Sequence, residues 1–164
     1  MREARAKVPV YIAFALVSIG LAGCGSATDP AAAPTPPAEP ARVLNHTSLF
    51  SDKDKVSTSV VPDHMLGMKA MPGGSFAEYE TKGQKYQMFI IDTDSTQKAA
   101  FMMLDMKAEL KKDPEYLPHI GGYFGMYGDQ PLYCFSKLHY LAGIVGLPKD
   151  KADPLALGLA AQLQ

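Results

Sequence analysis

The sequence predicts an α+β domain: a mainly antiparallel sheet of about five strands, one long helix packed on it and a short C-terminal helix. Three observations lead to this class. Two strand-like segments at 75–80 and 85–92 flank a short loop. An amphipathic helical pattern follows at 95–112, and three more strand-like segments lie between 121 and 146.

The first two strands read as a hairpin. The segments "SFAEYE" (75–80) and "KYQMFIID" (85–92) are joined by "TKGQ", a loop that contains Gly83. The second strand is apolar on both faces, so we expect it in the interior of the sheet.

The segment 95–112 is the strongest helix prediction. Asp94 is the expected N-cap, with Gln97 three residues later, and Pro114 is expected to stop the helix beyond two lysines at 111 and 112. The spacing of its apolar residues places one stripe against the sheet: Ala99, Met102, Met103, Met106 and Leu110.

Three further strands and a helix complete the predicted domain. The strands are expected at 121–128, 131–136 and 139–146. Asp153 and Pro154 are expected to begin the last helix, because proline suits the first helical position. One side of this helix is apolar: Leu155, Leu159 and Leu163.

The first 23 residues have the layout of a secretory signal peptide. A basic stub precedes the apolar run "VPVYIAFALVSI" (8–19), and small residues follow it. From Val8 to Ala22 there are only 15 residues, fewer than the roughly 20 that a spanning helix needs.

The run ends on "LAGC" (21–24), which resembles the lipobox of bacterial lipoproteins. The resemblance implies that Cys24 receives a diacylglycerol and that residues 1–23 are removed; in this class the new amino terminus is often acylated as well. The protein would then be held on a membrane, facing the periplasm or the cell exterior, by its fatty chains. Gly25 stands where an inner-membrane lipoprotein of this class often has aspartate, so the outer membrane is favoured.

An Ala- and Pro-rich tether follows at 24–42, and a single domain is expected at 43–164. From Cys24 onward the chain carries 13 of the 16 Lys and Arg residues and 16 of the 17 Asp and Glu residues, a net charge of −3. This balance gives no reason to expect nucleic-acid binding. Cys134, the remaining cysteine, is expected to be a buried structural thiol.

Two aspartates suggest an enzymatic alternative. The segment "MFIIDTDST" is similar to the first motif of haloacid-dehalogenase-type phosphohydrolases. The resemblance implies Asp92 as nucleophile and Asp94 as general acid and base beside magnesium. Only 72 residues follow Asp92, and they hold no later acidic pair. A strand end and a helix cap also explain both aspartates.

A methionine cluster suggests a second alternative. His64, Met65, Met68 and Met71 have the Met-x-x-Met spacing and the ligand types that suit Cu(I) or another soft metal. Methionine also fills irregular cores without any metal.

The remaining polar signals are weak. His46, His119 and His139 are isolated along the sequence and are expected to be surface or satisfied core residues. Asp52 and Asp54 in "SDKDK" read as a solvated charge run.

One looser resemblance covers most of the domain. The order "AEY", an apolar strand, "QKAAF", "GGYFG" and an aromatic strand pair is similar to an uncharacterised family of bacterial exported domains, which implies an α+β fold. The sequence therefore predicts a non-enzymatic binding or interaction module of unknown ligand, without a cofactor or metal and anchored to the membrane through Cys24.

Overall fold

Seven strands and two α-helices form the domain in the computed structural model, which describes residues 43–164. The predicted leader, Cys24 and the tether lie outside these residues. Two short 3-10 helices are η1 (Thr47–Leu49) and η2 (Met65–Gly67). The α-helices are α1 (Thr96–Glu109) and α2 (Lys149–Gln162). The strands are β1 (Lys55–Asp63), β2 (Pro72–Thr81), β3 (Gln84–Asp92), β4 (Lys111–Leu117), β5 (Gly122–Tyr127), β6 (Gln130–Lys137) and β7 (Tyr140–Val145).

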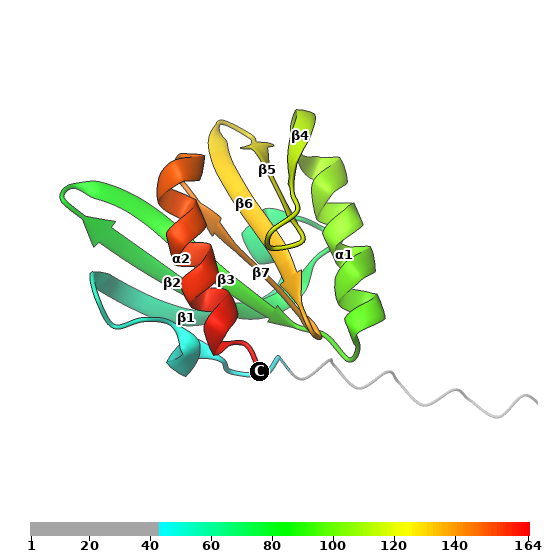
Figure 1. Cartoon of the computed structure of the whole chain (residues 1–164). Coiled ribbons are helices and arrows are strands. Elements are labelled where there is room, and N and C mark those ends of the chain that lie inside the picture. The colour runs from blue at the N-terminus through cyan, green and yellow to red at the C-terminus, as the bar shows by residue number, and fades with distance from the viewer. Residues whose placement is uncertain (1–42) are drawn as a thin grey trace, which may run out of the picture. The chain divides into compact units, whose positions relative to one another are not determined.

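The sheet consists of two antiparallel meanders joined in the middle. Its order is β1-β2-β3-β7-β6-β5-β4, and every neighbouring pair is antiparallel. The chain runs β1-β2-β3, then passes through α1 to β4 at the opposite edge (Figure 1). It returns through β5 and β6 to β7, which pairs with β3.

The two α-helices cover opposite faces of the sheet. Tyr133 and Cys134 are adjacent on β6 and both are completely buried, although successive strand residues point to opposite faces. The Tyr133 hydroxyl contacts Asp153 of α2. Tyr123, the cross-strand partner of Cys134, lies under the ammonium of Lys107 from α1. The sheet is therefore sandwiched in its middle, where β6 and β7 are buried on both faces.

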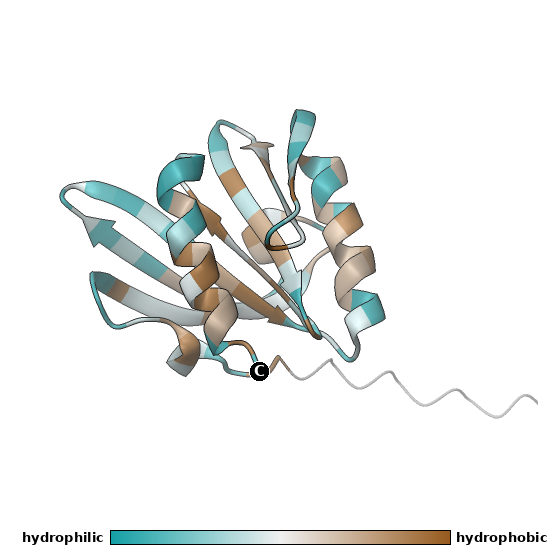
Figure 2. Ribbon diagram, in the orientation of Figure 1, coloured by the Kyte–Doolittle hydropathy of each residue, from teal (hydrophilic) through white to brown (hydrophobic). Residues whose placement is uncertain are grey.

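The core lies where the strands are most apolar. Figure 2 shows brown, apolar segments on β3, β7 and α2. The Phe89 ring of β3 lies close to Gly143 of β7: a Cβ at position 143 would lie 2.7 Å from ring atoms of Phe89. Glycine is required there because any side chain would overlap the ring.

The prediction of an α+β class is confirmed, and the estimate of five strands is wrong. The five expected strands correspond to β2, β3, β5, β6 and β7, whereas both edge strands were missed. β1 is exposed along nearly its whole length, so it lacks the apolar alternation that identifies a strand. β4 contains Pro114 and a bulge between Lys111 and Glu115, features that only an edge strand tolerates.

The ends of α1 also differ from the prediction. Ser95, not Asp94, is the N-cap, and its hydroxyl accepts a hydrogen bond from the backbone N–H of Lys98 at 3.2 Å. The helix ends at Glu109, because Leu110 turns to extended geometry and is buried. The two lysines that follow belong to β4, so Pro114 does not stop the helix.

The last helix begins earlier than predicted. α2 starts at Lys149, with the backbone N–H groups of Lys151 and Ala152 donating to the Pro148 carbonyl. Pro154 therefore lies inside α2 rather than at its first position. Within residues 43–164, neither α-helix has the length and hydropathy to cross a membrane.

Candidate functional site

The two aspartates of the phosphohydrolase-like motif make separate interactions. Asp92 ends β3, is 15% exposed, and its Oδ2 lies 2.7 Å from Nε2 of His46. Its Oδ1 lies 3.6 Å from Nε2 of His139. Asp94 is 87% exposed and pairs with Lys98 one helical turn later, at 2.6 Å. Asp92 is thus held between two histidines, and Asp94 faces solvent.

The Asp92 cluster fastens the first described segment to the sheet. The backbone N–H of His46 donates to the Ser75 hydroxyl at 2.7 Å, and its ring meets Tyr140 edge-on at 5.4 Å between centroids. Its imidazole contacts Asp92, which lies 46 residues later in the sequence. The isolated histidines of the sequence gave no sign of this arrangement because its members come from four distant segments.

The structure buries the methionines of the predicted soft-metal segment. Met65, Met68 and Met71 belong to the hydrophobic core. His64 is 52% exposed and has a left-handed backbone, and its Nδ1 lies 3.1 Å from Asp63. Within residues 43–164, no three His, Cys, Asp or Glu side chains are grouped so that they could hold a metal ion.

Cys134 is buried, as predicted. Its thiol donates to the Tyr123 carbonyl at 3.5 Å. Burial raises the pKa of the Cys134 thiol to about 12, so the reactive thiolate is not populated at neutral pH.

A second polar cluster joins α2 to the sheet. The hydroxyl of Tyr133 donates to Oδ1 of Asp153 at 2.6 Å, and Nε2 of His119 lies 2.6 Å from the same oxygen. The hydrogen bond from Tyr133 lowers the pKa of Asp153, and burial raises the pKa of Tyr133. Asp153, predicted as a helix start, instead fixes α2 on β6.

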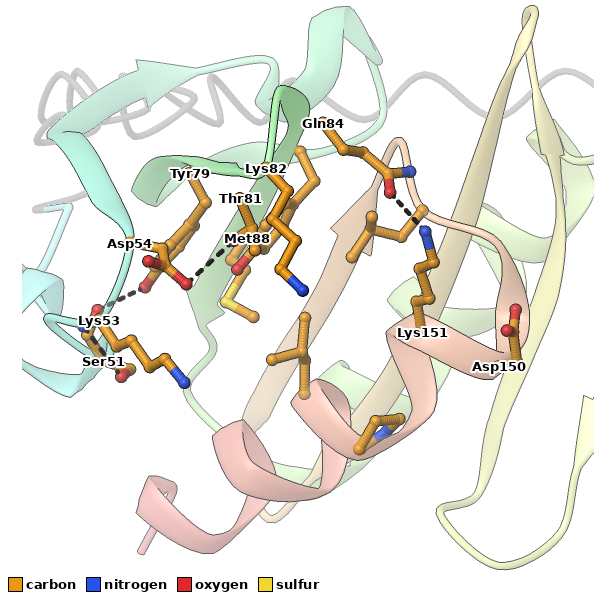
Figure 3. Close-up of a pocket in the computed structure, with 14 residues that line it drawn as sticks. Ser51, Lys53, Asp54, Tyr79, Thr81, Lys82, Gln84, Met88, Asp150 and Lys151 are labelled. Atoms are coloured by element: carbon orange, nitrogen blue, oxygen red, sulfur yellow. Dashed lines mark hydrogen bonds between the residues drawn. The ribbon is translucent and has the colours of Figure 1, made fainter.

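A cavity lies between the β2–β3 hairpin, the loop before β1 and the first half of α2 (Figure 3). We call it the α2 pocket. Its volume is about 650 Å³, which is in the range of small-molecule sites. Its apolar lining is Tyr79, Tyr86, Met88, Leu147, Pro154 and Leu155. Its polar lining is Ser51, Lys53, Asp54, Thr81, Lys82, Gln84, Asp150 and Lys151.

A stacked tyrosine pair forms part of the apolar floor. Tyr79 and Tyr86 are cross-strand partners, and their rings are 4.9 Å apart and within 8° of parallel. Their strands are joined by a two-residue turn, in which Lys82 and Gly83 both have left-handed φ angles. The Tyr79 hydroxyl donates to the Ser51 carbonyl at 2.9 Å and so fixes the loop that borders the pocket.

Both floor tyrosines are neutral at physiological pH. Burial raises the pKa of Tyr79 to about 12, and burial also raises the pKa of Tyr86. The floor therefore adds no charge to the α2 pocket.

Three lysines stand on the polar rim. Lys53 comes from the loop before β1, Lys82 from the hairpin turn and Lys151 from the first turn of α2. Figure 3 shows the Lys53 and Lys82 side chains extending toward the space between hairpin and helix. The Lys151 ammonium donates to the amide oxygen of Gln84 at 2.8 Å, across the pocket mouth.

A second cavity of about 440 Å³ continues along α2. It is lined by η1 and the later turns of α2, and it shares Ser51, Met88, Pro154 and Leu155 with the α2 pocket. An elongated ligand in the α2 pocket could therefore extend between η1 and α2.

The sequence predicted none of the pocket residues as a site. Asp54 belongs with Asp52 to the predicted solvated charge run "SDKDK", which also contains Lys53, and Lys151 precedes the predicted start of the last helix. One signal was available: a two-residue loop at 82–83 fixes the hairpin register and pairs Tyr79 with Tyr86. The chain matches no family model, no curated protein and no solved structure.

Proposed function

We propose that this chain is a lipid-anchored protein of the bacterial cell envelope whose domain is a non-enzymatic binding module, and that the α2 pocket holds its ligand. The observation that supports this most strongly is the pocket itself. It combines an apolar floor with a rim of separate polar groups, the usual composition of a small-molecule site.

The anchoring half of the proposal depends on the sequence before residue 43. The basic stub, short apolar run and "LAGC" support lipidation of Cys24. Mass spectrometry of the mature protein tests it: we expect a chain that begins at Cys24 and carries acyl groups. An intact leader, or an unmodified sulfur at position 24, would contradict it.

The binding half is tested with a neutral apolar probe. We expect 2-(2-naphthyl)ethanol to bind the mature protein, held in phosphatidylcholine nanodiscs, by calorimetry against a blank of empty nanodiscs. Leu155→Ser removes apolar surface from the pocket and should weaken binding by about tenfold.

Leu157→Ser is the matched control. Leu157 is in the same helix, two residues from Leu155, and is exposed outside the pocket lining. It should leave the affinity unchanged. Equal effects of both variants, or no binding by the wild type, would overturn the pocket as the binding site.

A further inference from the structure

We infer that the ligand of the α2 pocket is a small anionic amphiphile, a carboxylate or phosphate attached to an apolar body. This inference deepens the proposed function and rests on it. The structure points to it through the chemistry of the rim, where three ammonium groups border an uncharged floor.

The three rim lysines have no carboxylate partner. Among the residues that the structure describes, no Asp or Glu oxygen lies within 4.0 Å of the ammonium of Lys53, Lys82 or Lys151. Lys55, Lys98, Lys111 and Lys149 form ion pairs, and the other lysines of residues 43–164 do not, so what distinguishes the rim lysines is that three of them border one pocket. The rim lysines therefore keep their charge available for a bound anion.

The two carboxylates of the lining do not cancel this charge. Asp54 accepts a hydrogen bond from the Thr81 hydroxyl at 3.0 Å. Asp150 lies in the first turn of α2, and Figure 3 shows it at the far side of Lys151. Three lysines against two aspartates leave the pocket at +1, whereas residues 43–164 carry 12 basic and 14 acidic residues, a net charge of −2.

The apolar floor sets the second requirement on the ligand. Tyr79, Met88 and Leu147 are almost fully buried, and together they present an aromatic ring, a thioether and an aliphatic side chain, while the Tyr79 hydroxyl is already bonded to Ser51. A simple inorganic anion would leave this floor without a partner. An apolar body on the floor with its acid group at the rim satisfies both parts. A cavity of about 650 Å³ suits one such small molecule rather than a two-chain phospholipid.

The test compares three probes with one naphthyl body: 2-naphthylacetate, 2-(2-naphthyl)ethanol and 2-(2-naphthyl)ethylamine. Calorimetry uses the mature protein in phosphatidylcholine nanodiscs. We expect the acid to bind about tenfold tighter than the alcohol and the amine to bind weakest, because each partly exposed ion pair adds a modest amount. Added salt should reduce the difference in affinity between the acid and the other two probes.

Lysine variants test whether the rim lysines cause the preference for the acid over the alcohol. Lys82→Gln with Lys151→Gln should remove most of the tenfold preference for the acid over the alcohol. Both residues are exposed, so the fold should persist. Lys137→Gln is the control, because Lys137 is an exposed lysine at the far end of β6 and does not line the pocket.

Each outcome decides between the two proposals. If acid and alcohol bind equally, or if the lysine pair does not change the preference, the anionic class is wrong while the binding pocket stands. If no probe binds, both are wrong. Phosphatidylglycerol vesicles are added as competitors of bound naphthylacetate. If the vesicles displace it, the anion that the pocket binds is a lipid headgroup, and the proposal of a small soluble ligand is wrong.

Discussion

The rings of Tyr79 and Tyr86 lie face to face, 4.9 Å apart and within 8° of parallel. They are directly opposite on β2 and β3, and the pair forms part of the floor of the α2 pocket. A single hairpin thus supplies an apolar surface, and its turn supplies the Lys82 charge above it. The geometry explains how a small open sheet builds a pocket with an apolar floor and a charged rim.

Removing the Tyr79 hydroxyl should loosen the loop beside the pocket. Tyr79→Phe keeps the stacked rings and deletes the hydrogen bond to Ser51. We expect the free energy of unfolding to fall by about 0.5–1.5 kcal/mol, measured by urea denaturation. Tyr116→Phe, at a residue that is 56% exposed, should have no effect. Equal losses in the two variants would contradict the role of this hydrogen bond.

Asp153 should stabilise the domain in a pH-dependent way. Its pKa is lowered in the fold, first by the hydrogen bond from Tyr133 and then by His119. A lowered pKa means that the carboxylate contributes stability above its unfolded value of 3.8, and that this stability is lost as pH falls below it.

Asp153→Asn should therefore cost about 1–2 kcal/mol at pH 7, and the difference from wild type should vanish in acid. Urea denaturation at a series of pH values measures it. Asp150→Asn removes the same charge from the same helix without changing the hydrogen bond to Tyr133. It should cause a smaller loss in the free energy of unfolding, and that loss should depend less on pH. A pH-independent loss in Asp153→Asn would show that the charge is irrelevant.

The thiol of Cys134 should not react in the native protein. Its pKa is raised to about 12 by burial, above its ordinary value of 9.0, and its sulfur is covered. We expect mature protein to show no thiol reactive toward Ellman's reagent at neutral pH and one after denaturation. Two thiols after denaturation would mean that Cys24 is not lipidated. A thiol that reacts in the native protein, when denaturation reveals only one in total, would mean that Cys134 is accessible.

His46 should hold the first described segment in place. Its side chain pairs with Asp92 and its backbone with Ser75. His46→Ala should speed amide hydrogen exchange across η1, because the segment loses its imidazole–carboxylate contact. His64→Ala, an exposed histidine paired only with its neighbour Asp63, is the matched control. Unchanged exchange in η1 would contradict the anchoring role.

The parts of the fold that could be predicted are the elements in which the pattern of apolar residues indicates which side is buried. β3, the hairpin and the apolar stripe of α1 all carry periodic signals. β1 and β4 carry none, because an edge strand exposes both faces and tolerates Pro62 and Pro114. The start of α2 differs from the prediction because proline most often occupies the first helical position, whereas Pro154 lies inside α2.

The candidate site was less predictable than the fold. Lys53, Lys82 and Lys151 are separated by up to 98 positions in the sequence, and they line one pocket only because the fold brings the loop before β1, the β2–β3 turn and the first turn of α2 to its rim. Asp92 was singled out for an attack on phosphorus, and its neighbours His46 and His139 come from segments 46 and 47 residues away. Pairwise proximity of this kind depends on topology rather than on local pattern.

The most direct test of the account is a two-dimensional amide NMR titration of the mature protein with 2-naphthylacetate. We expect the shifted resonances to gather around the α2 pocket, at Ser51, Thr81, Lys82, Gln84 and Lys151. Saturable shifts at these positions would support it. Shifts that cluster on α1 or β4, or that are absent at saturating ligand, would contradict it.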